Sequence, residues 1–414
     1  MIPQNVLFIG LSWPEPTATA AGIRIMHLIQ FFIAQKCKIT FASTATVTTD
    51  AHVLLMKDVV TASITLNHDS FDDFVRNLNP DIVIFDRFYT EEQFGWRIAE
   101  QVPDALRILD TEDLHSLRAA REHCVKVGIP FTPLVWVQNE TTKREIASVY
   151  RCDLSLIISS FEMKLLTTEL KIDKNLLFYL PFLVENLTKK EKAQWPSYEE
   201  RNNFVFIGTG KHAPNIDAIK WLKHDIWPAI RRLMPSAQLK IYGSYFPEFI
   251  MQMHQPKDGF YVLGWAKEAK TVISEARVCL APLRFGAGLK GKLVDAMQYG
   301  TPSVTTPIGA EGINDTLPWG GFVQNDAVEF AEAAVQLYHD EALWLQAQTK
   351  GVHILAERFN RIDHLKRLQD ILSLKQKKLE VHRAANFTGA LLQHQTMAAT
   401  KYMSRWIQLK NAIN

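Results

Sequence analysis

A glycine- and lysine-rich loop is the stretch of this sequence best suited to chemistry. It spans residues 285–292, between an apolar run at 278–281 and a helical pattern that ends at Gly300. A strand, such a loop and a helix in this order present backbone N–H groups and the positive end of a helix dipole to a phosphate. Lys290 and Lys292 add positive charge for a diphosphate. A glycine turn with solvated lysines would show the same pattern, so the loop alone leaves both interpretations open.

Two carboxylates follow the loop at positions that could hold a ligand. Asp295 lies three residues after Lys292, on the same face of the expected helix, and could bind two hydroxyls of a ribose. Glu311 stands in a glycine-flanked loop after a short β-branched run at 303–306. Ligands of parallel α/β sheets bind at the carboxyl ends of the strands, so Glu311 is a candidate contact. The loop is not a Walker A motif, because no Gly-Lys-Ser/Thr follows at the required spacing.

A run of acids that ends in a histidine, residues 109–115, is the second stretch that could carry chemistry. It follows an apolar strand, and we expect a helix to begin near Thr111. Acids in the first turn of a helix also complement its dipole, so a surface helix turn is the alternative interpretation. Arg118 and Arg121 lie on roughly one side of this helix, where they could meet an anionic ligand. We favour solvated positions for both.

Alternating strands and helices must position these residues. An apolar helical face follows Gly22, at positions 25, 28, 29, 32 and 33. The first half of the chain has six short apolar runs that predict buried parallel strands, at 6–9, 39–42, 82–85, 106–109, 154–158 and 176–180. The order strand, helix, strand is that of a doubly wound sheet.

A charged and polar stretch with Pro196 separates this half from a second β/α series. The second series has further strands at 204–207, 239–242, 261–263 and 278–281. The predicted fold class is therefore α/β, with two facing Rossmann-like, doubly wound parallel sheets. We divide the chain into a first domain at 1–186, a linker at 187–203, a second domain at 204–356 and helices at 357–414 that pack back on the first domain.

The composition excludes several other classes. A formal charge of +2 over 414 residues gives no basis for a nucleic-acid surface. Four scattered cysteines without a Cys-x-x-Cys pair argue against a zinc site or a disulfide scaffold and fit a reducing compartment. No basic residue precedes the first apolar run, and no run approaches the ~20 apolar residues of a spanning helix. We expect a cytoplasmic protein.

A series of landmarks in the second half resembles a known family. They are Phe-Ile-Gly-Thr-Gly at 206–210, Ile-Trp-Pro at 226–228, Val-Leu-Gly-Trp at 262–265, and Gly-Ala-Gly-Leu-Lys-Gly-Lys-Leu-Val-Asp-Ala-Met-Gln-Tyr-Gly-Thr-Pro at 286–302. In this order they resemble the donor domain of GT-B glycosyltransferases of family 4, over about residues 200 to 355. The first half resembles the acceptor domain of that fold more weakly, through Ala20-Ala21-Gly22, a degenerate form of the family's Gly-Gly loop.

The resemblance implies a nucleotide-diphosphate-sugar donor, used as a co-substrate with no cofactor and no metal, and transfer with retention to a glycan or lipid-linked acceptor. It implies that Asp295 holds the ribose, as the second acid of the family's E-x7-E pattern. The first position of that pattern is Ala287, which cannot contact the sugar through a carboxylate. The segment 109–115 is similar to the one that offers a histidine to the donor sugar, so His115 is the catalytic candidate.

The remaining candidates follow from the same resemblance. The family's basic pair on the donor phosphates has only Lys211 as a match in the Gly208 loop, so Lys290 and Lys292, with the backbone of Gly288 and Leu289, replace it as the diphosphate site. Candidate donor-sugar or nucleotide contacts also include Gly264. The loop at 13–22, ending at Gly22, and Arg24 are assigned to the acceptor side. Two alternatives remain open: a GT-B nucleotide-sugar epimerase, and a non-catalytic partner subunit that binds a nucleotide sugar.

The C-terminal region offers two surface features. The basic run from Lys375 to Arg383 could make a peripheral contact with an anionic membrane that holds a lipid-linked acceptor, although a solvated helix face is the interpretation we favour. The aromatic residues Phe387, Tyr402 and Trp406 we interpret as packing. The oligomeric state is not readable from the sequence.

Overall fold

The first domain is built on one all-parallel, seven-stranded sheet. The computed structural model describes residues 5–17, 19–46, 54 and 58–413. The strand order is β3-β2-β1-β4-β5-β6-β7. The chain adds strands toward one edge of the sheet up to β3 and toward the other edge from β4 onward, so the topological switch point lies between β1 and β4. The strands are β1 (Asn5–Gly10), β2 (Lys38–Ser43), β3 (Val60–Ser63), β4 (Ile82–Asp86), β5 (Leu106–Asp110), β6 (Leu154–Ile157) and β7 (Leu177–Tyr179). Their near-continuous burial fits a sheet covered by helices on both faces.

The helices of the first domain connect successive parallel strands, as right-handed crossovers require. They are α1 (Ala20–Ala34), α3 (Ser70–Leu78), α4 (Arg87–Gln101), α5 (His115–Val127), α6 (Pro133–Val137), α7 (Glu140–Arg151) and α8 (Ser160–Thr168). Two apolar clusters form the core, one on each face of the sheet. The helix expected near Thr111 begins only at His115, because Glu112 takes a positive φ of 61° that no α-helix accommodates.

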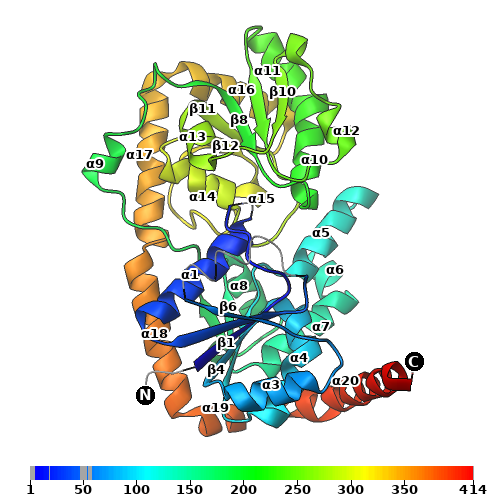
Figure 1. The fold of residues 1–414 in the computed structure, drawn as a ribbon. Coiled ribbons are helices and arrows are strands. Elements are labelled where there is room, and N and C mark those ends of the chain that lie inside the picture. The colour runs from blue at the N-terminus through cyan, green and yellow to red at the C-terminus, as the bar shows by residue number, and fades with distance from the viewer. Residues whose placement is uncertain (1–4, 18, 47–53, 55–57, 414) are drawn as a thin grey trace.

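The second domain holds a six-stranded parallel sheet of order β10-β9-β8-β11-β12-β13. Its strands are β8 (Asn202–Ile207), β9 (Leu239–Tyr242), β10 (Phe260–Gly264), β11 (Ala276–Ala281), β12 (Ser303–Thr305) and β13 (Gly321–Val323). Its helices are α10 (Ala213–Trp221), α11 (Trp227–Leu233), α12 (Glu248–Met251), α13 (Ala269–Ser274), α14 (Gly291–Gln298), α15 (Pro307–Ala310) and α16 (Ala327–His339). The two sheets confirm the predicted pair of doubly wound domains, which lie one above the other in Figure 1.

The chain crosses between the domains at two adjacent places. The N–H of Val184 donates to the carbonyl of Phe359 at 2.9 Å, and the N–H of Arg361 donates to the carbonyl of Val184 at 3.0 Å. The helix α9 (Lys189–Lys192) follows the first crossing, and Asn360 caps the helix after the second by accepting from the N–H of Ile362. The domains are thus joined at one hinge-like point.

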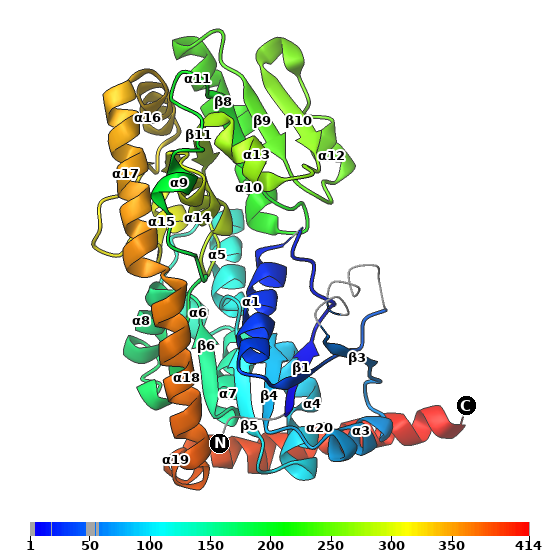
Figure 2. The same cartoon turned by 60° about the vertical axis from the view of Figure 1, so that its left-hand side comes forward.

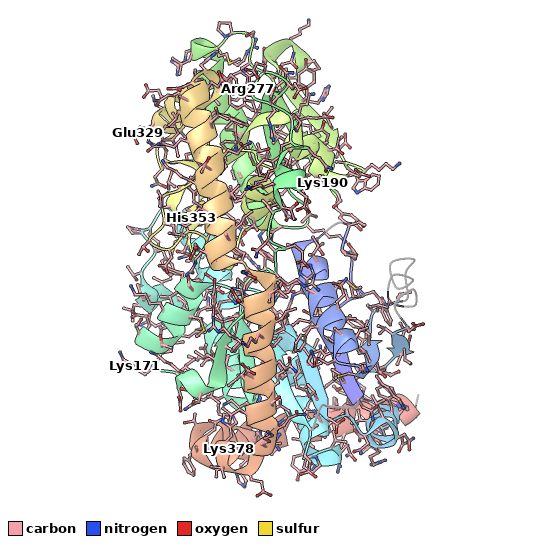
Figure 3. All side chains as sticks on the ribbon, turned by 90° about the vertical axis from the view of Figure 1, so that its left-hand side faces the viewer. Lys171, Lys190, Arg277, Glu329, His353 and Lys378 are labelled. Carbon is pink, nitrogen blue, oxygen red and sulfur yellow. The ribbon has the colours of Figure 1, made fainter. Side chains whose placement is uncertain are left out.

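The C-terminal helices return to the first domain, as predicted. The helices α17 (Glu341–Arg358) and α18 (Arg361–Lys377) run end to end along one side of both domains (Figure 3). Leu368 and Leu372 of α18 join the core of the first domain. The last helices, α19 (Leu379–Ala385) and α20 (Phe387–Ile413), continue across its base, and α20 lies against α4 and α7 (Figures 1 and 2).

An apolar contact joins the two domains near the glycine-rich loop. Ile158 and Phe182 of the first domain share a buried cluster with Leu289 and Leu293 of the second. Ala287 packs into a core cluster of the first domain. The carboxyl ends of both sheets therefore meet at this junction, where the predicted site residues lie.

Candidate functional site

The glycine-rich loop connects β11 to α14 and is buried against the first domain. Gly286 and Gly288 have φ angles of 150° and 62°. A Cβ on Gly288 would lie 2.7 Å from the Cβ of Asp113, so only glycine permits this approach of the two domains. Lys290 stands at the start of α14, where the sequence predicted the phosphate-binding helix terminus.

A carboxylate from the first domain accepts the loop's backbone N–H. The N–H of Gly288 donates to Oε1 of Glu162 at 2.8 Å, and the N–H of Leu114 donates to the same oxygen at 3.0 Å. Burial raises the pKa of Glu162 to about 8. Sequence reasoning missed this residue, although an acid in the first turn of the helix after β6 lies at the same sheet edge as the other candidates.

The two loop lysines point to different partners. Nζ of Lys290 donates to the carbonyl of Gly288 at 2.9 Å, and burial lowers its pKa. Nζ of Lys292 donates to Oδ1 of Asn215 at 2.5 Å and lies 4.3 Å from the centre of the Phe206 ring. Burial lowers the pKa of Lys292 to about 7.

Gly208 lies directly against Lys292 and Asn215. A Cβ on Gly208 would stand 2.8 Å from Nζ of Lys292 and 2.6 Å from Cγ of Asn215. The structure therefore brings together the Gly208 loop and the lysine that was proposed to serve the same phosphate. Asn215, on the first turn of α10, was not proposed as a ligand residue, although Pro214-Asn215 is one of the sequence landmarks that resemble the family.

Asp295 and Lys292 make no ion pair with each other, although they were placed on one helix face. Asp295 is half-buried, and no partner is found for its carboxylate among the described residues. Burial raises its pKa to about 7. A carboxylate that is partly desolvated and unpaired can accept hydroxyl groups from a ligand at little cost.

His115 is the first residue of α5 and lies at the domain junction. Its Nε2 is 3.3 Å from Oδ1 of Asp113, and its backbone N–H donates to Oε1 of Glu145 at 2.9 Å. The imidazole packs against Tyr89, with ring centres 5.6 Å apart. Burial lowers the pKa of His115 to about 4, so the ring is uncharged at neutral pH.

The aspartate beside His115 is held in its charged form. Burial would raise the pKa of Asp113, but the adjacent Arg118 guanidinium and His115 lower it to about 2. His212 of the Gly208 loop is also within electrostatic reach of Asp113 and Arg118, and burial lowers the pKa of this histidine to about 4. Sequence reasoning missed His212, which follows Lys211 without a recognisable motif.

Arg121 is buried, which corrects the solvated position that we favoured. Its Nη1 and Nη2 donate to Oε1 and Oε2 of Glu311, each at 2.8 Å, and Nη1 also donates to the carbonyl of Gly286 at 2.8 Å. The guanidinium lies over the rings of Phe131 and Phe161, at 5.0 and 5.2 Å. Arg121 is buried because this face of α5 packs against the second domain, and the residue pattern within one helix does not reveal such a contact. The carboxylate of Glu311 is therefore engaged in a bidentate pair across the junction.

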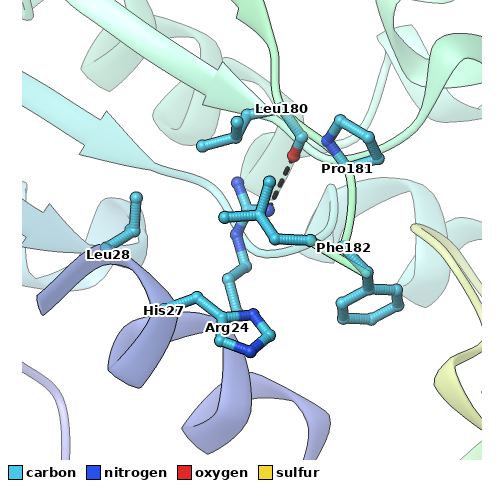
Figure 4. A pocket seen from close by; sticks show the side chains of 7 residues that line it. Arg24, His27, Leu28, Leu180, Pro181 and Phe182 are labelled. Carbon is cyan, nitrogen blue, oxygen red and sulfur yellow. Dashed lines mark hydrogen bonds between the residues drawn. The ribbon is translucent and has the colours of Figure 1, made fainter. Parts of the chain in front are cut away.

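Arg24 is turned into the first domain. Its Nε donates to both oxygens of Asp110, at 2.9 and 3.0 Å, and its Nη1 donates to the carbonyl of Leu180 at 2.7 Å (Figure 4). The hollow beside Arg24 and His27 has no space for a water molecule. Gly22 lies in the first turn of α1, where a Cβ would come within 2.5 Å of the backbone of Glu15. Both residues thus shape the loop at 13–22, of which residue 18 lies outside the described residues.

The other candidates lie at the carboxyl edge of the second sheet. Lys211 is exposed, with Nζ 3.5 Å from the centre of the Tyr245 ring. Gly264 ends β10 with a φ of 73° and faces open space. Within the described part of the chain, no cluster of three or more His, Cys, Asp or Glu side chains could hold a metal ion.

The second domain matches a known family. Residues 201–340 match the family described as glycosyl transferases group 1. The second domain is thus similar to the domains of group 1 glycosyltransferases. The match includes β8, the glycine-rich loop and α14, and it confirms the predicted class of enzyme. No curated protein has a detectable sequence match to this chain.

Solved structures of glycosyltransferases share the whole two-domain architecture. A glycosyltransferase from Rickettsia africae ESF-5 has a TM-score of 0.64 and 11% identity, over 89% of this chain and 97% of that one. Sucrose-phosphate synthase (tll1590) from Thermosynechococcus elongatus has a TM-score of 0.66 and 15% identity, over 90% and 98%. Anabaena Alr3699/HepE in complex with UDP and glucose has a TM-score of 0.66 and 12% identity, over 89% and 99%. These similarities confirm the predicted GT-B fold.

Proposed function

We propose that the glycosyltransferase moves a sugar from a nucleotide-diphosphate donor to a glycan or lipid-linked acceptor, with retention and without a metal. The observation that carries this proposal is the meeting of two groups at the domain junction. Lys292 and Gly208 of the second domain lie on one side, and the uncharged His115 of the first domain lies on the other. His212 connects the two sides, because it is within electrostatic reach of both Lys292 and Asp113, and Asp113 contacts His115. A transferase with one substrate on each domain needs this arrangement.

Lys292, Asn215 and the Gly208 loop form the proposed diphosphate site. The hydrogen bond from Lys292 to Asn215 fixes the ammonium directly against Gly208, where a Cβ would collide with both side chains. Negative charge grows on the diphosphate as the bond to the sugar breaks, and a preorganised cation stabilises that charge. Lys290 and the positive end of α14 add to the same field.

His115 is the proposed contact to the donor sugar. An uncharged imidazole can donate from one ring nitrogen and accept at the other. With Nε2 protonated toward Asp113, Nδ1 is the acceptor for a sugar hydroxyl. Asp295, without a partner of its own among the described residues, is the proposed ribose ligand.

The loop backbone requires an exchange of partners. The N–H of Gly288 is bonded to Glu162, so a donor oxygen that uses this N–H must displace that carboxylate. Leu289, one residue on, is buried between the domains. We therefore propose that a donor enters when the two domains separate.

A nucleotide screen tests the donor assignment. HepE is described in complexes with UDP and UDP-glucose, so uridine diphosphate and its sugars are the first compounds to try. A ligand at 100 times its Kd raises the free energy of unfolding by about 2.7 kcal/mol, which a thermal shift detects. The stabilisation should be lost in Lys292→Ala and retained in Lys350→Ala, whose side chain is exposed on α17. Equal stabilisation of both variants would contradict the diphosphate site.

A non-catalytic partner subunit remains the second candidate, favoured by one observation. Ala287 leaves the sugar without the expected carboxylate and is buried among residues of the first domain. Nucleotide stabilisation without turnover of any nucleotide sugar, with glycan acceptors present, would support that role. Isomerised donor in the absence of an acceptor would instead support an epimerase.

We also propose a cytoplasmic enzyme that meets a lipid-linked acceptor at the inner face of the membrane. Among the described residues, no helix is long and apolar enough to cross a bilayer. Contact with the membrane would therefore be peripheral, and it needs a docking surface on the folded protein.

A further inference from the structure

The C-terminal helix α20 presents its apolar side chains to solvent. Phe387, Leu391, Tyr402, Trp406 and Leu409 are 75%, 49%, 68%, 57% and 65% exposed. Their spacing of 4, 11, 4 and 3 residues places them on one side of the helix. We call these five residues the α20 stripe. It corrects our expectation that the aromatic residues of this region pack inside the protein.

The opposite side of α20 packs against the first domain largely through small and polar residues, and Leu392 and Ile407 are half-buried. Gln393 donates through Nε2 to the carbonyl of Arg151 at 3.0 Å. Ser404 accepts through Oγ from Nη2 of Arg97 at 3.4 Å. Gly389 lies so close to the carbonyl of Tyr150 that a Cβ would come within 2.2 Å. Small and polar residues therefore hold the helix in place, and the apolar side is left for a partner.

The charged residues of α20 itself are all basic, although Lys401 pairs with Glu100 and Arg405 lies within electrostatic reach of Asp69. After Glu380 the sequence contains no aspartate or glutamate, whereas Lys401, Arg405 and Lys410 flank the stripe. Lys410 lies 5.3 Å from the centre of the Trp406 ring. Lysine and arginine beside tryptophan, tyrosine and leucine are typical of helices that lie in the headgroup region of an anionic bilayer. A second copy of this helix would bring like charges together, which disfavours self-association through the stripe.

Two residues of the basic run predicted to contact a membrane are occupied by intramolecular bonds. Nζ of Lys375 donates to the carbonyl of Asn175 at 2.5 Å. Arg383 donates to both oxygens of Asp153, at 2.8 and 2.7 Å. These two side chains are fixed against the first domain, whereas Lys377 and Lys378 of the same run are exposed, so the run offers only part of its charge to a membrane.

We propose that the α20 stripe docks the enzyme on an anionic lipid surface. This proposal rests on the membrane location proposed above and names the surface responsible for it. In Figures 1 and 2, α20 lies at the end of the first domain that is farthest from the second domain. The junction of the two domains therefore faces away from the bilayer. This orientation suits an acceptor whose reactive end stands off the membrane on an extended glycan.

Vesicle flotation of the full chain tests the proposal. The probes are vesicles of phosphatidylcholine alone and of equal parts phosphatidylcholine and phosphatidylglycerol. We expect flotation with the anionic vesicles only. The triple variant Tyr402→Ser, Trp406→Ser, Leu409→Ser should abolish it, and the double variant Arg405→Gln, Lys410→Gln should reduce the partition coefficient roughly 30-fold.

The matched control replaces exposed apolar residues outside α20, as Val60→Ser, Leu134→Ser and Ile362→Ser, which are 62%, 63% and 68% exposed. It should float like the unmodified protein. Absence of flotation, or an equal loss in the control, overturns the proposal. A dimer that the stripe variant disrupts, without any change in flotation, also overturns it. Thermal stabilisation by uridine diphosphate is measured on the same samples, so failure of membrane docking is distinguished from failure of the proposed donor site.

Discussion

At the scale of single residues, Lys292 sits where its ammonium loses much of its hydration. Nζ has one oxygen partner, Asn215, and faces the ring of Phe206. Burial lowers its pKa to about 7, below its usual value of 10.5, so the side chain changes charge near neutral pH. Such a lysine is protonated when the pH is below its pKa, or when a bound anion raises that pKa.

We therefore expect the affinity for a nucleoside diphosphate to fall as the pH rises through about 7. The protonated form of Lys292 attracts the diphosphate, and each pH unit above its pKa lowers the charged fraction up to about tenfold. Calorimetry measures the affinity for a nucleoside diphosphate at about pH 6 and about pH 9. The unmodified protein should bind more tightly than Lys292→Met at the lower pH, and this advantage should shrink at the higher pH. Lys350→Met serves as the control, since its ammonium donates to Gln346 of its own helix. A ratio that does not change with pH would mean that Lys292 is not a phosphate ligand.

Glu162 is a second residue whose titration is linked to the fold. Its pKa is raised from 4.5 to about 8 by burial, so the folded state binds a proton that the unfolded state has released. The stability from this group is fully present below about pH 4.5 and is lost as the pH rises through about 8. The variant Glu162→Gln, which carries no titratable proton, should flatten this part of the stability profile in urea titrations.

Removal of the Glu162 side chain has a separate consequence. In Glu162→Ala the N–H groups of Leu114 and Gly288 lose their common acceptor. Unpaired buried donors cost about 1 to 3 kcal/mol each, so we expect the free energy of unfolding to fall by about 2 to 6 kcal/mol. Glu162→Gln keeps an acceptor oxygen and should lose less than about half as much. Equal losses in the two variants would show that these hydrogen bonds contribute little.

At the scale of elements, the glycine-rich loop needs a positive φ and the absence of a Cβ at the same residue, Gly288. Gly288 has a φ of 62°, and it approaches Asp113 more closely than a Cβ permits. Gly128 at the end of α5 has a similar φ of 71° but has nothing within 4 Å of its Cβ position. Comparing alanine substitutions at Gly288 and Gly128 therefore separates two contributions to the free energy of unfolding. One is the strain of a positive φ, and the other is the loss of the contact between the domains.

We expect Gly288→Ala to weaken the contact between the domains, and Gly128→Ala to show only the backbone cost of about 1 kcal/mol. The added methyl at position 288 must push away Asp113 and the start of α5, so the affinity for a nucleoside diphosphate should also change. Urea unfolding and calorimetry on both variants provide the comparison. Similar stability and affinity in the two proteins would contradict the close packing of the loop on the first domain.

The elements show what the sequence can and cannot predict. The strands ending at Asp86 and Asp110 are short apolar runs, so their positions and the common edge formed by their carboxyl ends could be predicted from the sequence alone. Arg121 could not be assigned, because its environment is created by a helix face meeting a loop 190 positions away. Glu162 and His212 were missed for the same reason. Their roles depend on contacts between domains, whereas periodicity describes only contacts within one element.

The start of α5 is a local example of the same limit. Acids at 110–113 predicted the first turn of a helix, but the structure uses them as loop residues at the junction. Asp110 binds Arg24, and Asp113 lies beside His115 and Arg118. These acids lie together because strand ends converge at the junction of the two domains.

At the scale of the whole molecule, the two domains are joined covalently at one place and elsewhere by contacts that can open. The adjacent crossings at Val184 and Asn360 form the covalent connection. The noncovalent connections include the pair of Arg121 with Glu311 and the bond from Gly288 to Glu162. A change in either contact should shift the balance between closed and separated domains.

We expect Arg121→Gln to shift the enzyme toward separated domains. The substitution leaves the Glu311 carboxylate without its cation, and breaking a buried ion pair from one side costs about 3 to 5 kcal/mol. Small-angle X-ray scattering should show a larger radius of gyration than for the unmodified protein. The control Lys143→Gln removes one member of an exposed pair with Glu140 and should leave the radius unchanged.

A double-mutant cycle then isolates the interaction itself. Arg121→Gln with Glu311→Gln removes both charges, so the unfolding free energy of the double variant should exceed the value expected from adding the two single losses. A coupling energy near zero, with an unchanged scattering profile, would show that the pair does not hold the domains together. A clear coupling would instead identify Arg121 and Glu311 as a latch that must open before a donor reaches the loop at 285–292.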